Sequence, residues 1–202
     1  MLLIVLELLM LSPQEFAAAW GEDRYCFPPD ILHDVDIPAS SIQFLVEAGL
    51  PRQAEGPRPY IVPLPRVLVT PPVQAARHPL LTRYGSTPFR LLAYLHTDNY
   101  LDDKYALYHA VEEKTGHIYW VGPGVRTEPP SFVNTSITHF AEFLLCFRDF
   151  GTRFRQAEPI GSRIRHVPFS TLKREWQVID PAALTDPDNY WVMAYYDIME
   201  CF

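Results

Sequence analysis

The sequence contains few cysteines, and the motifs of the common enzyme classes are missing. Only three of its 202 residues are cysteine, and none belongs to a C-x-x-C pair. This argues against a zinc ribbon and a thioredoxin-type redox site, and it favours a reducing, cytoplasmic setting. A G-x-S-x-G elbow, a G-x-x-x-x-G-K-[ST] loop and an H-E-x-x-H pair are also absent. We therefore expect neither an enzyme nor a cofactor.

The remaining candidates for chemistry are weak. His96 and Asp98 could supply two metal ligands, but no third ligand is evident, so we expect no metal site and interpret the segment as a solvated loop. His109 lies on an apolar strand face and is expected to be a satisfied core histidine. Ser136 and His139 lie three residues apart, but capping of a helix explains Ser136, and no acid is placed to orient the histidine. We expect no catalytic residue.

The first residues are apolar but lack the features of a targeting signal. Met1–Met10 has only Glu7 as a charged residue, no basic segment and no A-x-A cleavage pattern, and it is too short to span a bilayer. Ser12 and Glu15 then form a capping box around Pro13, and Leu11 and Phe16 occupy the positions of a hydrophobic staple. We predict an N-terminal extension at residues 1–9 and one domain at residues 10–202, with Met10 as the functional start.

Composition predicts a packed domain. The chain is 48% hydrophobic and 13% aromatic, which is enough for a sizeable core. Its 20 prolines concentrate in Pro51–Pro88, where long loops are expected. A strand at Tyr60–Val69 would be split or confined to a sheet edge by its prolines.

The middle of the chain has the clearest pattern. Three strands are expected at Arg90–Leu95, Tyr105–Val111 and His117–Val121. Both faces of the second strand are apolar, which predicts a central position in a sheet. Gly116 lies in the hairpin loop after the second strand and is expected to supply the positive φ that the turn needs. A deeply buried helix capped by Ser136 follows, and then a polar loop at Gly151–Val167.

Further helices are expected on both sides of this block. They are predicted at about Pro38–Ala48 with Gly49 after its end, at Ser170–Gln177, at Pro181–Leu184, and from Pro187 with Asp186 as N-cap. The expected fold class is therefore α+β: a single domain with a mostly antiparallel central sheet and helices packed around it.

The order of these motifs resembles the SUKH superfamily (Smi/Knr-like proteins), and most closely its fourth subfamily. The segments that carry the resemblance are Ile37–Pro51, Thr115–Tyr119, Phe132–Ser136, Phe140–Leu144 and Ile179–Trp191. They extend over about Pro13 to Trp191. The long loops at Arg52–Pro88 and the segment Gln156–Pro168 depart from the family pattern. Gly116, Asn134 and Ser136 belong to the matching motifs, and we interpret them as structural; the Asn134 side chain is expected to bridge backbone groups between strand and helix.

The resemblance implies a binding protein. Many members are bacterial immunity proteins, so the expected function is stoichiometric inhibition of a cognate toxin, a nuclease or another nucleic-acid-directed enzyme. A SUKH-type adaptor with a housekeeping partner is the alternative, and an enzyme is the third reading. An adjacent toxin gene would favour immunity, and activity abolished by one substitution would favour an enzyme.

Charge is unevenly distributed along the chain, whose net charge is −7. Arg148–Arg174 has seven basic and two acidic residues, whereas Glu175–Phe202 has six acidic residues and no lysine or arginine. These segments could neutralise each other, or one could face a partner. The acidic excess disfavours direct binding of nucleic acid and favours a basic protein partner. No membrane partner is expected, and the oligomeric state is open.

The loop Thr97–Lys104 is the first candidate for such contacts. It could be a solvated hairpin tip, a partner-binding patch with an aromatic anchor among carboxylates, or a calcium site, although its spacing is not that of an EF-hand. The predicted partner-binding residues are Asp98, Tyr100, Asp102 and Asp103 in this loop and Glu112 and Glu113 on the next one. The two groups lie at opposite ends of one strand, so they are not expected to join one compact site.

Overall fold

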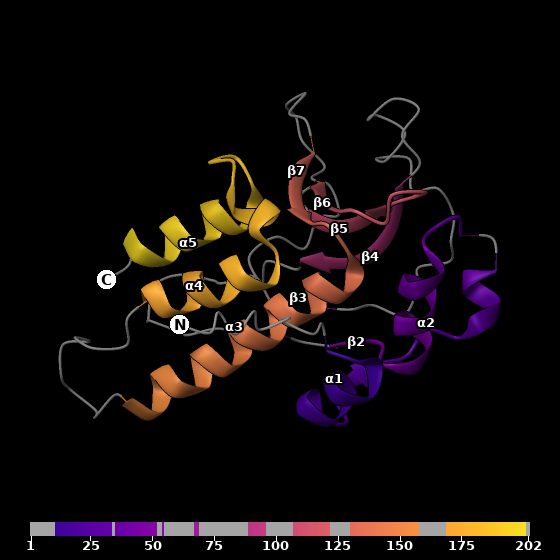
Figure 1. The fold of residues 1–202 in the computed structure, drawn as a ribbon, viewed down its shortest axis with the longest axis horizontal. Helices are drawn as coiled ribbons and strands as arrows, with labels where there is room; N and C mark the ends of the chain where they lie inside the picture. The colour runs from indigo at the N-terminus through magenta and orange to yellow at the C-terminus, as the bar shows by residue number, and fades with distance from the viewer. Residues whose placement is uncertain are drawn as a thin grey trace, which may run out of the picture.

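The computed structural model describes residues 11–33, 35–51, 54, 67–68, 89–95, 107–121, 130–157 and 169–200. Two antiparallel sheets and the helices around them form one α+β domain (Figure 1), as the sequence predicts. The helical elements are α1 Pro13–Trp20, η1 Pro29–Leu32, α2 Ala39–Glu47, α3 Ile137–Ala157, α4 Phe169–Ile179, η4 Pro181–Leu184 and α5 Tyr190–Glu200. The strands are β1 Arg24–Tyr25, β2 Leu50–Pro51, β3 Val67–Leu68, β4 Phe89–Leu95, β5 Leu107–Glu112, β6 Ile118–Val121 and β7 Ser131–Asn134.

The larger sheet has the order β3-β4-β5-β6-β7, and every pairing in it is antiparallel. The predicted central strand is confirmed as β5, because the apolar residues on both of its faces require cover on both sides. The described part of the predicted Tyr60–Val69 strand is β3 at the sheet edge, where prolines are tolerated. Strand β7 was not expected; it has only four residues and pairs with β6 through a register shift at Ile118.

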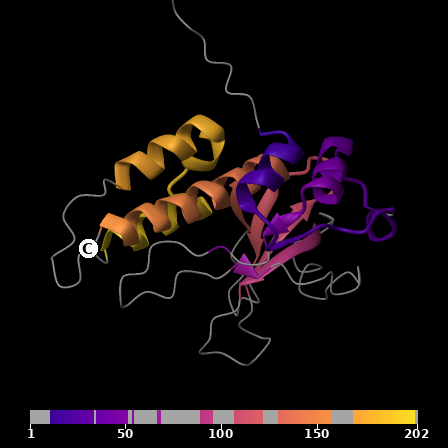
Figure 2. The same cartoon turned by 90° about the horizontal axis from the view of Figure 1, so that it is seen from below.

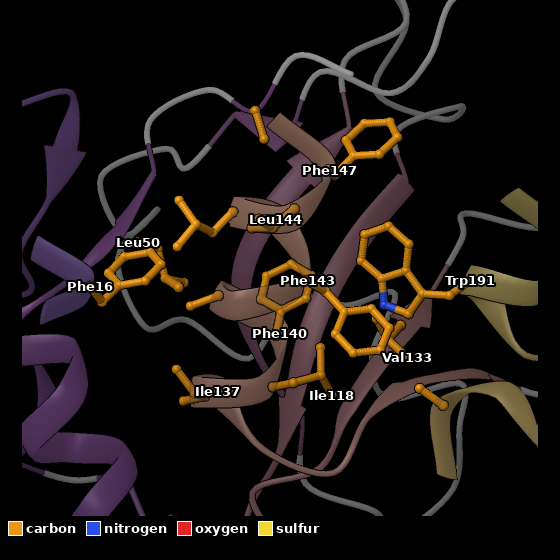
Figure 3. Packing of buried hydrophobic residues seen from close by; sticks show 14 of the residues in the cluster. Phe16, Leu50, Ile118, Val133, Ile137, Phe140, Phe143, Leu144, Phe147 and Trp191 are labelled. Atoms are coloured by element: carbon orange, nitrogen blue, oxygen red, sulfur yellow. The ribbon is translucent and has the colours of Figure 1, made fainter. Parts of the chain in front are cut away.

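Helix α3 organises the core. Its apolar residues point in several directions, so the helix is covered on more than one side (Figure 3). Leu144 lies toward Phe16 and Leu50, whereas Phe143 and Phe147 lie toward Trp191. In Figure 1, α1 and α2 are on the right of the molecule and α4 and α5 on the left, and Figure 2 shows α3 crossing the sheet. Burying this many aromatic side chains supplies the main stabilisation of the fold.

The prediction of a polar loop from Gly151 was wrong. Helix α3 continues through Gly151 to Ala157. Phe154 extends the buried stripe of the helix, and its ring centroid lies 6.3 Å from that of Phe150 and 5.9 Å from that of Phe169. This aromatic contact with the start of α4 stabilises two further helical turns in which the polar residues face outward.

The N-terminal helix begins as predicted. Ser12 and Glu15 form both hydrogen bonds of the capping box, and Pro13 is the first helical residue. The Leu11 amide donates to the Glu142 carboxylate at 2.6 Å. The Arg148 guanidinium donates to the carbonyls of Ala19 and Trp20 and lies 4.6 Å from the centre of the Trp20 ring. Both ends of α1 are thereby attached to α3.

Gly49 and Gly116 have backbone conformations that other residues rarely adopt. Gly49 follows α2 with φ +72°, and a Cβ there would lie 2.2 Å from the Tyr25 carbonyl oxygen, so β1 and β2 can pair only because this residue has no side chain. Gly116 has φ +74°, and a Cβ there would lie 2.9 Å from Pro38. The predicted roles of both glycines are confirmed.

The last helix starts later than predicted. Asp186 does not cap α5; its carboxylate accepts from the Asp188 amide at 2.9 Å in a turn. The helix begins at Tyr190, and the amides of Val192 and Met193 donate to the Asn189 carbonyl. A local side chain–backbone turn therefore competes successfully with an earlier helix start.

Candidate partner-binding surfaces and buried polar sites

A buried polar network joins the end of β7 to the segment after α4, and we call it the polar junction. It consists of Asn134, Thr135, His139, Asp180 and Trp191. The Asp180 carboxylate accepts from the Asn134 amide nitrogen at 3.1 Å, the Thr135 amide at 2.8 Å and the Thr135 hydroxyl at 3.2 Å. The Trp191 ring nitrogen donates to the Asn134 oxygen at 2.9 Å. Asn134, the last residue of β7, thus contacts both Asp180, which precedes η4, and Trp191 of α5.

The environment of Asp180 keeps its carboxylate charged. Burial alone would raise the pKa of Asp180, but hydrogen bonding with His139, Thr135 and Asn134 lowers it below its usual value. The side chain is only 2% exposed. A buried charge with three donors around one oxygen stabilises the native arrangement and is costly to disrupt.

The polar junction does not have the geometry of a nucleophilic triad. The His139 Nδ1 atom lies 2.7 Å from the Thr135 hydroxyl and 3.6 Å from Asp180. An acid therefore does lie near this histidine, contrary to expectation, but Asp180 and the Thr135 hydroxyl face the same ring nitrogen. A triad places the nucleophile and the acid on opposite nitrogens of the imidazole. Ser136 caps α3 as predicted, accepting from the His139 amide at 3.1 Å. The expectation that Asn134 bridges backbone groups was wrong in its partners, because they are side chains.

His109 is buried in a different way. Its ring lies between Phe140 and Tyr190, with centroids 5.0 Å and 5.1 Å away, and neither of its nitrogens has a hydrogen-bond partner among the described residues. The cross-strand neighbour Trp120 also has an unpartnered, buried ring nitrogen. Burial lowers the pKa of His109 to about 3. The prediction of a satisfied core histidine was therefore half right: the residue is in the core, but it is not satisfied.

The hairpin between β5 and β6 contains the predicted partner-binding residues that the structure describes. The Glu112 carboxylate accepts from the Thr115 hydroxyl at 2.7 Å, and Glu113 has an interaction partner as well. The Lys114 amide donates to the Asp36 carbonyl. The hairpin therefore lies against the segment before α2, and its two carboxylates are locally engaged. Asp98, Tyr100, Asp102 and Asp103 lie outside the described residues, as do His96 and the rest of the loop.

A second acidic surface lies on and before α5. Asp186, Asp188 and Asp197 are exposed, and in the described part of the chain no basic side chain pairs with them. Tyr196, at 55% exposure, stands beside Asp197. The run of acids without lysine or arginine was visible in the sequence, but it did not single out Tyr196. Which residues of an amphipathic helix face outward depends on what the helix packs against.

The basic and acidic segments meet between α3 and α4. Arg153 pairs with Glu175 at 3.1 Å beside an open hollow of about 490 Å³, which Cys146, Asp149 and Thr152 also line. Burial raises the pKa of the Cys146 thiol to about 12, and the carboxylates of Glu175 and Asp149 add to the effect. A thiol with such a pKa stays protonated and is a poor nucleophile.

The described residues show neither a cluster of metal-ligating side chains nor a membrane-spanning helix. They contain no group of three His, Cys, Asp or Glu side chains that could hold a metal ion. No helix among them is long and apolar enough to cross a membrane.

Fold and site together define an α+β domain whose sheet and closing helices are connected by the polar junction. This arrangement unites the motif segments Phe132–Ser136 and Ile179–Trp191 in space. The model of the SUKH-4 immunity protein family matches residues 11–197, and the chain belongs to this family. No curated protein and no solved structure matches it.

Proposed function

We propose that this protein binds a cognate toxin and neutralises it by stoichiometric protein–protein contact. The observation that carries the proposal is the family match, which extends over nearly the whole chain and includes both segments that build the polar junction. An immunity protein acts by covering its target, so it needs a stable scaffold and an exposed surface rather than reactive groups.

The proposed target is a basic protein, and a nuclease or other nucleic-acid-directed toxin fits this description. Such enzymes bind phosphate and are commonly basic. The net charge of this chain is −7, and several of its carboxylates are exposed with no basic partner among the residues that the structure describes. Opposite charges accelerate encounter and align the two surfaces.

The residues predicted from the sequence to contact the toxin remain part of the proposal. They are Asp98, Tyr100, Asp102, Asp103, Glu112 and Glu113. The double substitution Asp102→Lys and Asp103→Lys is expected to weaken toxin binding without unfolding the domain. The double substitution Glu22→Lys and Asp23→Lys changes the net charge equally at exposed positions just after α1, and it serves as the control. Unchanged affinity in the first variant would remove that loop from the interface.

The function is tested by capture of partners on the tagged protein from lysate of its native cells, read by mass spectrometry. A single stoichiometric partner with a toxin domain, whose activity is abolished when the purified proteins are mixed, is the expected result. Ordinary cellular proteins as partners, together with no effect on any co-encoded toxin, would favour the adaptor function and overturn immunity.

A further inference from the structure

One face of α5 combines the exposed Tyr196 and Asp197 with the half-buried Met193. Met193, Tyr196 and Asp197 follow one another at helical spacing, and Tyr196 is one of only two large hydrophobic residues that are exposed in the described part of the chain. Asp186 and Asp188 lie in the turn before the helix. These five residues are called the α5 surface below.

Tyr196 packs against an aromatic neighbour on its own helix. Its ring contacts the half-buried Tyr195 ring edge to face, at 5.9 Å and 76°. Lys173 of α4 lies 5.1 Å from the centre of the Tyr195 ring, where a cation–π contact is favourable. A tyrosine has only two side-chain torsions, so it loses less conformational entropy than a long flexible side chain when a partner covers it. Such a tyrosine is a typical anchor of a protein interface.

The charges of the α5 surface remain available to a partner. Two other acids of the same acidic segment have internal partners, since Glu175 pairs with Arg153 and Asp180 belongs to the polar junction. Asp186, Asp188 and Asp197 have no basic partner among the described residues. The Asp186 carboxylate accepts from the Asp188 amide within the turn, and this local hydrogen bond does not neutralise its charge.

We propose that the α5 surface docks an arginine-rich segment of the partner protein. A guanidinium can stack on the Tyr196 ring and pair with the Asp197 carboxylate at the same time. A second copy of this chain is disfavoured as the occupant, because a symmetric dimer would bring the same carboxylates together. The inference deepens the proposed function by naming a surface and the chemistry of the segment it binds.

The test uses nona-arginine and nona-lysine as probes, with binding followed by NMR and calorimetry at low and physiological salt. Arginine peptide is expected to shift the resonances of residues 193–197 first. The triple substitution of Asp186, Asp188 and Asp197 to Lys should weaken binding about tenfold, since several exposed ion pairs are lost together. Tyr196→Ala should weaken binding of the arginine peptide more than that of the lysine peptide, because only guanidinium stacks well on the ring.

A matched triple substitution separates a local surface from overall charge. The control combines Glu22→Lys, Asp23→Lys and Asp30→Lys, at exposed positions between α1 and α2. It changes the net charge by the same amount and should weaken binding less than threefold. Equal losses in both triple variants would overturn the proposal, as would shifts centred outside α5. A dimer that Tyr196→Ala dissociates in sedimentation would also overturn it. Failure to neutralise any toxin would reject the proposed function instead, because peptide mapping does not depend on a toxin.

Discussion

The polar junction and the His109 site differ in how they bury a polar side chain against the same helices. Asn134 and Asp180 are buried with their hydrogen-bonding groups paired, and they join three elements. His109 is buried as deeply, yet in the part of the chain that the structure describes neither of its ring nitrogens has a partner. Satisfied buried groups stabilise and specify a structure, whereas unsatisfied ones reduce its stability. The stability of this domain is therefore expected to depend on the polar junction and to be limited by His109.

Among the substitutions, compared at neutral pH, removal of the central carboxylate should have the largest effect. Asp180→Ala is expected to lower the free energy of unfolding by about 3 kcal/mol, because it leaves the buried donors of Asn134 and Thr135 unpaired. Urea unfolding followed by tryptophan fluorescence measures this. Asp186→Ala, an exposed acid close in sequence, is the control and should change stability little. A loss below about 1 kcal/mol for Asp180→Ala would show that the junction contributes less than its geometry indicates.

As the pH falls, His109 should lower the stability of the domain at a higher pH than Asp180 does. The ring is neutral in the native state, with a pKa of about 3, whereas the unfolded chain binds a proton below about pH 6.5. Stability should therefore fall by about 1.4 kcal/mol per pH unit as the pH decreases from 6.5 toward 3. The contribution of Asp180, whose pKa is lowered, is present above its unfolded value of about 3.9 and is lost only as the pH falls below it.

This pH dependence is checked by urea unfolding at a series of pH values, with His109→Leu beside the wild type. The difference between the two proteins isolates one side chain from the other histidines. Parallel curves between pH 6.5 and about 4.5 would contradict the assignment of acid sensitivity to His109.

The Asn134 side chain should contribute somewhat less to the free energy of unfolding than the Asp180 carboxylate does. Asn134→Ala is expected to cost about 2 kcal/mol, because the Trp191 ring nitrogen loses its acceptor and Asp180 keeps its two bonds to Thr135. In a double-mutant cycle, the variant with both Asn134→Ala and Asp180→Ala should lose less stability than the sum of the two single losses. Strict additivity, measured by thermal and urea unfolding, would mean that the two side chains do not act as one network.

The smallest expected effect is a gain. At pH 7.5, His109→Leu should raise the free energy of unfolding by about 1 kcal/mol, since an apolar side chain of similar size has no unsatisfied nitrogen. Thermal unfolding measures the change, and Val111→Ala, a truncation of a buried neighbour on β5, should destabilise by contrast. A destabilised His109→Leu variant would indicate that the imidazole shape is required between Phe140 and Tyr190.

Several local features of the fold could be predicted because they depend on adjacent residues. The capping box at Ser12 and Glu15, the glycine turns at Gly49 and Gly116 and the capping of α3 by Ser136 all form as expected. The end of α3 could not be predicted, because the Phe154 contact with Phe169 is made by a residue distant in sequence. The start of α5 was missed because Asp186 forms a turn with Asp188 instead of a cap.

The candidate surfaces were only partly accessible from the sequence. The acidic segment after Glu175 was evident, but its charge could not be divided between internal and external roles without the fold. The structure assigns Glu175 and Asp180 to partners within the chain and leaves Asp186, Asp188 and Asp197 exposed. The engagement of Glu112 by Thr115 likewise required side-chain positions.

By itself, the sequence determined the α+β class, the central position of β5 and the motif order that marks the SUKH-4 family, because periodicity, turns and caps are encoded within short segments. Only the tertiary structure decided that Asn134 meets Asp180 and Trp191, that the His109 ring is enclosed between Phe140 and Tyr190, and that Tyr196 faces outward. These features depend on which segments pack together, and that packing is determined by burial of the aromatic core around α3 rather than by any one motif.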